Sequence, residues 1–370
     1  MISLEELLDM DLSYISANLD YEFSCMSGKR LLITGGAGFL GYYLVQSVLH
    51  WNKSKSIGDR IHVTVYDNYV RGVPSWLTAL SGNSNLTVVR QNMIEPLPDL
   101  MPDFSYIIHA AGIASPIYYR KHPIETMDAN VNGLRSLLDY SRNQVEKGKP
   151  IDGFLFFSSS EIYGDPSLDK IPTSEDYRGL VSCTGPRACY DESKRYGETL
   201  CVNFGHQYDL PTKIARPFNN YGPGLKITDR RVLPDFARDV ISGKDIVMFS
   251  DGTPKRTFCY IADAIIGYYK VLINGRKCES YNIGIETPEI SILTLAEKVV
   301  STAKELFGYT GTVVRMKNSE NNYLVDNPNR RCPAIKKARE HLGYNPTILI
   351  DEGLKRSLTW YYYNRVAAEA

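Results

Sequence analysis

The sequence predicts an α/β fold: a doubly wound parallel sheet with a smaller mixed α/β lobe on the C-terminal side. Two observations predict this fold. In residues 30–216, short apolar runs alternate with amphipathic helical segments, which is typical of strands joined by right-handed helical crossovers. After Arg216, Pro, Gly and Asn cluster in residues 217–224, and shorter, irregular segments replace this alternation.

The chain is expected to have three parts. Residues 1–29 form an N-terminal helical extension, because four leucines recur there at helical spacing. We expect this extension to pack on the body of the protein or on a partner subunit. Residues 30–216 form the sheet domain, to which later segments near 260–285 return, and residues 217–370 form mainly the smaller lobe.

Each expected strand of the sheet domain is a short apolar or β-branched run. The strands cover residues 30–34, 61–66, 86–89, 106–109 and 154–157. Between and after them, apolar side chains recur on one helical face. The expected helices cover residues 39–50, 123–140 and 190–206.

Composition excludes several classes of function. The 370 residues include 42 Lys and Arg and 42 Asp and Glu, and a neutral chain is a poor candidate for non-specific nucleic-acid binding. Its 7 cysteines contain no C-x-x-C pair, so neither a metal site nor a disulfide framework is expected, and a reducing cytoplasmic location is favoured. We find no signal peptide and no apolar run of membrane-spanning length.

A glycine-rich turn follows the first expected strand and opens the first helix of the sheet domain. Gly35, Gly38 and Gly41 have G-x-x-G-x-x-G spacing, which allows a tight turn and a close approach of the backbone to a pyrophosphate. Free N–H groups at the helix start would bind the phosphates. The motif predicts a Rossmann-type dinucleotide site; without a ligand it would be a tight turn only.

Asp67 ends the second expected strand. A carboxylate at this position can accept hydrogen bonds from both ribose hydroxyls of NAD, and it would repel the 2′-phosphate of NADP. NAD is therefore the expected cofactor, although an Asp followed by Asn68 is also common in a turn.

Tyr190 and Lys194 are four residues apart on an expected helix and so share a face. A nearby ammonium favours the phenolate and would lower the pKa of Tyr190 from its usual value of about 10. Such a tyrosine can take a proton from a sugar hydroxyl while a nicotinamide takes the hydride. On its own, the same spacing could be a surface pair.

Ser159, Ser160 and Glu161 follow the fifth expected strand, and ligands bind beyond the carboxyl ends of such strands. A serine there can hydrogen-bond the reacting hydroxyl. Glu161 adds a carboxylate that a simple oxidation does not need, so we expect it to act as an acid or base at a neighbouring carbon. The alternative for Glu161 is a solvated turn residue.

Taken together, these motifs resemble the extended short-chain dehydrogenase/reductases, or NAD-dependent epimerase/dehydratase family, that act on nucleotide sugars. Within that family the chain is most similar to the UDP-glucuronate decarboxylases, over about residues 29–362. The matching stretches are Gly35–Gly41, Asp67–Tyr69, Ala114–Tyr119, Pro123–Thr126, Ser160–Pro166, Gly185–Glu192, Ala215–Pro223, Asp229–Val232, Lys255–Phe258 and Asp326–Ile335.

The resemblance implies a mechanism and a set of roles. Tyr190, with Lys194 and Ser159, would remove the O4 proton of UDP-glucuronic acid while NAD⁺ takes the C4 hydride. The resulting β-keto acid would lose CO₂ and give UDP-xylose, with Ser160 and Glu161 acting near C5. The implied cofactor contacts are Gly35, Gly38, Phe39, Leu40, Gly41, Asp67, Asn68, Asn92, Met93, Tyr190 and Lys194; the implied substrate contacts are Ser115, Tyr119, Asn219, Arg231, Arg256 and Arg331.

Arg256 has a further implied role as a catalytic residue, near the substrate carboxylate or the diphosphate. Asn92 and Met93 stand where the family usually has Asp-Val near the adenine, so altered adenine recognition is expected. By analogy with the family, the helices at 123–140 and 190–206 would pair in a homodimer.

Three other functions remain open. A nucleotide-sugar 4,6-dehydratase normally has an acid where this chain has Ser160. A 4-epimerase would leave Glu161 without a role. A non-catalytic NAD-binding regulator would have no need for the combination of Ser159, Tyr190 and Lys194.

Overall fold

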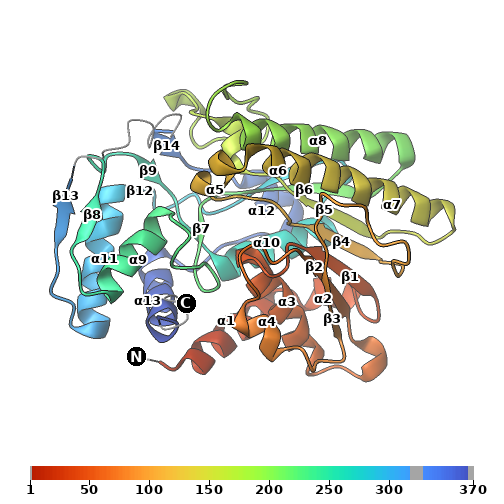
Figure 1. Cartoon of the computed structure of the whole chain (residues 1–370), viewed down its shortest axis with the longest axis horizontal. Coiled ribbons are helices and arrows are strands. Elements are labelled where there is room, and N and C mark those ends of the chain that lie inside the picture. Colours follow the sequence, from red (N-terminus) through yellow and green to blue (C-terminus); the bar gives the residue numbers. More distant parts are fainter. Residues whose placement is uncertain (1, 317–327, 366–370) are drawn as a thin grey trace.

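A parallel sheet with helices packed against it forms one part of the protein, on the right in Figure 1, and the elements around α9, α11 and α13 lie on the left. The computed structural model describes residues 2–316 and 328–365, and within them seven strands form this sheet in the order β11-β6-β5-β4-β1-β2-β3. The strands are β1 (Arg30–Thr34), β2 (His62–Asp67), β3 (Leu86–Arg90), β4 (Tyr106–His109), β5 (Gly153–Phe157), β6 (Thr212–Pro217) and β11 (Ser280–Ile283). The predicted doubly wound parallel sheet is confirmed, and its strand order reverses between β1 and β4, where ligands bind in such folds.

Alternating side chains of each strand pack on opposite faces of the sheet. Leu31 and Ile33 join one apolar cluster, whereas Leu32 joins the other, as the two-residue period of a strand requires. The helices α3 (Phe39–Asn52) and α10 (Ile261–Asn274) cover the first face. The helices α7 (Leu134–Glu146) and α8 (Ala188–Tyr208) cover the second. Burial on both faces explains why the inner strands β1, β4 and β5 are almost continuously apolar, whereas the edge strand β3 is mostly exposed.

The helix expected over residues 123–140 is confirmed, with a π-helical turn inside it. The chain forms α6 (Pro123–Asp128), then a π-helical segment (Ala129–Gly133), then α7, without a gap. Packing gives the reason for the π-helical turn. A Cβ on Gly133 would lie 2.8 Å from the carbonyl oxygen of Met93, and buried Asn130 donates a hydrogen bond to Ser193 Oγ at 2.9 Å. The π-helical segment therefore fits this stretch between the loop after β3 and helix α8.

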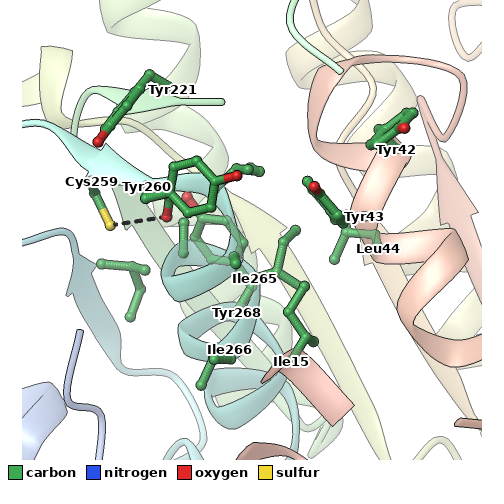
Figure 2. Packing of buried hydrophobic residues seen from close by; sticks show 14 of the residues in the cluster. Ile15, Tyr42, Tyr43, Leu44, Tyr221, Cys259, Tyr260, Ile265, Ile266 and Tyr268 are labelled. Atoms are coloured by element: carbon green, nitrogen blue, oxygen red, sulfur yellow. Dashed lines mark hydrogen bonds between the residues drawn. The ribbon is translucent and has the colours of Figure 1, made fainter. Parts of the chain in front are cut away.

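The N-terminal extension packs on the body, one of its two expected arrangements. Its helices are α1 (Leu4–Asn18) and α2 (Asp20–Cys25). Figure 2 shows Ile15 between α3, which carries Leu44, and α10, which carries Ile265. Asp11 is fully buried, and it accepts hydrogen bonds from Tyr43, from the Tyr260 hydroxyl at 2.6 Å and from Arg356 at 2.6 Å.

The chain after β6 adds helices and three small sheets, with strand orders β12-β9-β14, β10-β7 and β13-β8 among the described residues. In the first of these sheets, β9 and β14 run parallel and place Arg256 opposite Arg331. The elements are β7 (Asn220–Tyr221), α9 (Val232–Ile241), β8 (Ile246–Met248), β9 (Lys255–Arg256), β10 (Cys259–Tyr260), β12 (Ile290–Ser291), α11 (Ile292–Phe307), β13 (Val313–Arg315), β14 (Arg330–Arg331), α12 (Lys336–Leu342) and α13 (Ile350–Tyr363).

Short helices occupy several loops of the sheet domain. They are η1 (Ile57–Asp59), α4 (Ser75–Ala79), α5 (Pro116–Lys121), η3 (Ser160–Tyr163) and η4 (Leu168–Lys170).

In the part of the chain that the structure describes, no helix has both the length and the apolar character needed to cross a bilayer.

Candidate active site

The glycine turn between β1 and α3 leaves no room for side chains. Gly35 has a φ of +71°, and a Cβ there would lie 2.7 Å from the backbone of Ala111. A Cβ on Gly41 would lie 2.0 Å from the carbonyl oxygen of Gly36. Helix α3 begins at Phe39 immediately after the turn, so its first N–H groups and its positive dipole end lie at the turn. This cradle fits a pyrophosphate.

Asp67, at the end of β2, lies against the same turn. Its Oδ2 accepts a hydrogen bond from Ala37 N at 3.0 Å, and its Oδ1 accepts one from Tyr69 N at 2.8 Å. Burial raises the pKa of Asp67, while these two hydrogen bonds lower it. Asn68 donates to Asn92 Oδ1 at 3.3 Å. The predicted ribose and adenine residues are thus beside the phosphate cradle, and together they fit the adenosine half of NAD.

Tyr190 and Lys194 lie at the start of α8 and are both buried. Lys194 Nζ donates to the carbonyl oxygen of Phe157 at 2.8 Å and lies 5.7 Å from the centre of the Tyr190 ring. Tyr119 stacks on Tyr190 with ring centres 5.1 Å apart. The expected side chains therefore come together at the carboxyl end of β5.

The expected lowering of the Tyr190 pKa by Lys194 is not what the structure gives. Burial raises the pKa of Tyr190 to about 12, although a hydrogen bond with Ser159 and the charge of Arg231 lower it. Burial also lowers the pKa of Lys194 to about 7. The reason is that both side chains are desolvated, which disfavours the phenolate and the ammonium alike.

Glu161 lies in η3, directly after Ser159 and the buried Ser160. Ser159 Oγ accepts a hydrogen bond from Glu161 N at 3.2 Å. The Glu161 carboxylate pairs with Arg331 through two hydrogen bonds of 2.6 Å and also with Arg187. Burial alone would raise its pKa, but Arg331 and Arg187 hold it at about 2. The two arginines therefore favour the anionic form of Glu161, and its role as an acid or base stays a prediction.

Arg256 adds a third guanidinium to this cluster. It lies beside Arg331 in the small sheet and donates to the carbonyl oxygens of Lys255 at 2.7 Å and Asn329 at 3.1 Å. Burial and the charge of Arg331 lower the pKa of Arg256 to about 9. Three guanidinium groups thus surround Glu161, and a buried cluster of this kind favours an additional anion.

Two residues of this cluster were missed by the sequence reasoning. They are Arg187 and Asp191, which flank Tyr190 in the Gly185–Glu192 stretch. Arg187 Nε lies 4.0 Å from Asp191 Oδ2, and Asp191 Oδ1 has no hydrogen-bond partner among the described residues. Burial and the charge of Glu161 raise the pKa of Asp191 to about 7. Their position beside Tyr190 in the sequence was the signal that could have identified them as site residues.

Three other residues predicted to contact the substrate donate hydrogen bonds to groups of the protein itself. Ser115 Oγ donates to the carbonyl oxygen of Asp229 at 2.9 Å, and Asn219 Nδ2 donates to that of Thr257 at 2.9 Å. Arg231 Nε pairs with the Asp229 side chain. Arg231 is near enough to Tyr190 for its charge to lower the pKa of the tyrosine, whereas Ser115 and Asn219 are held by backbone carbonyls.

Within residues 2–316 and 328–365, no cluster of His, Cys, Asp or Glu is arranged to hold a metal ion.

Comparison with known proteins identifies related sequences and structures. Residues 31–284 match the NAD dependent epimerase/dehydratase family. UDP-glucuronic acid decarboxylase 5 of Arabidopsis thaliana is 35% identical over 330 residues, which cover 89% of this chain and 88% of that protein. A second similar protein is UDP-glucuronic acid decarboxylase 1 of Xenopus tropicalis. It is 33% identical, and the match covers 90% of this chain and 72% of that protein.

A solved structure has the same fold. It is a tyrosine-to-phenylalanine mutant of the UDP-glucuronic acid 4-epimerase from Bacillus cereus, in complex with UDP-4-deoxy-4-fluoro-glucuronic acid and NAD. It is 25% identical to this chain, with a TM-score of 0.73, and the match covers 90% of this chain and 98% of that one.

Proposed function

The chain belongs to the NAD dependent epimerase/dehydratase family, and we propose that it uses NAD to convert UDP-glucuronate into UDP-xylose with loss of CO₂. The main observation is the buried cluster in which Arg187, Arg256 and Arg331 surround Glu161 next to Tyr190. The relatives named UDP-glucuronic acid decarboxylase support the same reaction. A sugar with a carboxylate at C5 suits this surplus of positive charge.

Tyr190 is the base for the sugar 4-hydroxyl in this proposal. The hydrogen bond with Ser159 and the charge of Arg231 favour its phenolate form, and Lys194 is held in place by the carbonyl of Phe157. Bound NAD⁺ would supply a reversible hydride acceptor, so the overall reaction would have no net redox change. The glycine turn, Asp67, Asn68, Asn92 and Met93 would hold this cofactor.

The loss of CO₂ from a β-keto acid moves the negative charge from the carboxylate to the ketone oxygen at C4, so a hydrogen-bond donor at that oxygen, where the protonated Tyr190 would lie, lowers the barrier. Arg256 and Arg331 would bind the substrate carboxylate, and Glu161 would orient Arg331 and Arg187 rather than carry a proton. Ser160 would contact the sugar near C5. Asp191, with its pKa of about 7, exchanges a proton in this cluster around neutral pH.

The nucleotide sugar would lie between the sheet domain, residues 30–216 with the returning segment near 260–285, and the lobe of residues 217–370. Its proposed contacts in addition to the arginine cluster are Ser115, Tyr119, Asn219 and Arg231. The orphaned Tyr119 hydroxyl, which is buried and has no hydrogen-bond partner among the described residues, supports a polar ligand at this place.

A homodimer is the proposed assembly. Ile124 and Met127 are exposed on α6 and Tyr196 on α8, and Met127 and Tyr196 line the same surface hollow; pairing of two copies there would bury them. Light scattering at micromolar concentration should give twice the monomer mass, and a monomer would contradict this assembly.

The 7 cysteines are all free, which supports a reducing, cytoplasmic location.

The reaction can be tested by mass spectrometry of the products. The protein and NAD⁺ would be incubated with UDP-glucuronate, UDP-glucose and TDP-glucose in parallel. Loss of one CO₂ from UDP-glucuronate supports the proposal, and Tyr190→Phe should reduce this turnover by about 10²-fold or more. Loss of water from a hexose would indicate a dehydratase, an unchanged mass with a new retention time an epimerase, and no reaction a regulator.

A further inference from the structure

A second buried carboxylate lies between two arginines, outside the Glu161 cluster. The Asp229 side chain is only 1% exposed. Arg71 Nη1 lies 2.7 Å from its Oδ2, and Arg231 Nε donates to its Oδ1. These two guanidinium groups outweigh the cost of burial and lower the pKa of Asp229, so the group of three carries one net positive charge.

The two arginines come from different parts of the chain. Arg71 follows Asp67 in the loop after β2, whereas Arg231 directly precedes α9. Two further contacts fasten this junction. Lys226 Nζ donates to the carbonyl oxygen of Arg71, and the Arg71 guanidinium lies 5.0 Å from the centre of the Tyr118 ring. Asp229 therefore joins the proposed cofactor loop to the loop that precedes α9.

Arg231 keeps part of its guanidinium free for a ligand. Only its Nε is used on Asp229, and its two Nη atoms make no hydrogen bond to the described residues. Its guanidinium lies 5.6 Å from the centre of the Phe39 ring, at the start of α3. It is thus between the phosphate cradle and Tyr190, whose pKa its charge lowers.

We propose that Arg71 is a positioning residue for the nucleotide sugar: by balancing the charge of Asp229, it leaves Arg231 with a net positive charge and a fixed orientation toward the diphosphate. This inference rests on the proposed function, which supplies the diphosphate. Without Arg71, the carboxylate of Asp229 would neutralise Arg231 alone. Because the Asp229 carboxylate is buried, its charge acts strongly on the adjacent Arg231, and the affinity for the diphosphate would fall.

The test is titration of the purified protein with UDP by calorimetry. Arg71→Ala should weaken UDP binding at least tenfold, and Arg71→Lys should recover most of the affinity. Asp229→Asn added to Arg71→Ala should also recover it, because the amide still accepts the Arg231 hydrogen bond and the net charge returns to one. A merely structural role of Arg71 would not be rescued in this way. Arg276→Ala, in an exposed loop with a side chain 64% exposed, is the control and should bind UDP as the wild type does.

Two results would overturn the inference: an Arg71→Ala variant within twofold of the wild type, or a double variant no better than Arg71→Ala alone. A wild type that fails to bind UDP would also overturn it. Product analysis separates this failure from that of the proposed function. If the wild type releases CO₂ from UDP-glucuronate but UDP binding does not depend on Arg71, only the inference is rejected. If UDP binding depends on Arg71 but no CO₂ is lost, only the decarboxylase reaction is rejected.

Discussion

Glu161 and Arg331 face each other in a two-pronged ion pair, with Arg331 Nη1 2.6 Å from Oε1 and Nη2 2.6 Å from Oε2 of the carboxylate. The two residues are 170 positions apart in the sequence. Glu161 follows the sheet strand β5, and Arg331 belongs to β14 in the small three-stranded sheet. The pair therefore connects the catalytic end of the large sheet to the arginines proposed to bind the substrate carboxylate.

Removal of the Glu161 charge should affect both stability and catalysis. In Glu161→Gln, Arg331 and Arg187 lose their buried anion, and breaking such a pair costs about 3–5 kcal/mol. We expect a loss of that size in the free energy of unfolding measured with urea. We also expect turnover of UDP-glucuronate to fall by about 10²-fold, because the guanidinium groups lose their orientation.

The neighbouring Arg330–Glu289 pair provides a matched control. It is also two-pronged but more exposed, with 32% of the Arg330 side chain accessible. Glu289→Gln should cost about 1 kcal/mol or less and leave turnover unchanged. Equal losses in the two variants would mean that the Glu161 pair has no special role.

Asp191 should make stability depend on pH. Its pKa is about 7 in the folded chain, against 3.8 for the unfolded reference, so the folded state keeps a proton that the unfolded state loses. The contribution to stability is therefore full below pH 3.8 and falls as the pH rises toward 7, by about 4 kcal/mol at most. Asp191→Asn removes this titration, so the variant should gain stability relative to the wild type between pH 4 and pH 7.

Urea unfolding at several pH values measures this difference, with Asp99→Asn on the exposed surface as the control. A difference between Asp191→Asn and the wild type that does not change with pH would reject the assignment.

The glycine turn gives a prediction about close packing. In Gly41→Ala, the new Cβ would overlap the carbonyl oxygen of Gly36, 2.0 Å away. We expect a loss of about 3 kcal/mol in the free energy of unfolding, at the upper end for an overpacked site, together with weaker NAD binding. Gly58→Ala has nothing within 4 Å of its Cβ and should change stability by less than about 0.5 kcal/mol. Similar stability of the two variants would contradict this packing.

Asp11 should make the N-terminal extension essential for stability. Asp11→Ala leaves the partly buried Arg356 without the carboxylate that lies 2.6 Å away, and Tyr43 and Tyr260 lose their acceptor. We expect a loss of about 3 kcal/mol in the free energy of unfolding. Asp9→Ala, which lies exposed on the same helix, should have little effect. A small change in Asp11→Ala would mean that the extension is only loosely attached.

Local patterns predicted the fold and the glycine turn. The strands β1 to β5 are apolar runs, and the turn from Gly35 to Gly41 is defined by neighbours in the sequence, so both could be predicted from the sequence. The π-helical turn after Asp128 could not, because it depends on packing between Gly133 and the loop at Met93.

The electrostatics of the site depended on contacts distant in sequence. The pKa of Glu161 is lowered by Arg331, which lies far along the chain. The roles of Arg187 and Asp191 follow from burial around Glu161, and Arg71 meets Asp229 across 158 positions. Pairings of this length follow from the three-dimensional arrangement of the strands and loops, and no local motif marks them.

The most direct test of the central claim is the reaction of UDP-glucuronate with the protein and NAD⁺ in D₂O, followed by mass spectrometry. The account predicts a UDP-pentose that has lost one CO₂ and gained one non-exchangeable solvent deuteron at C5, without net accumulation of NADH. A product that retains its carboxylate, with or without inversion at C4, would contradict it.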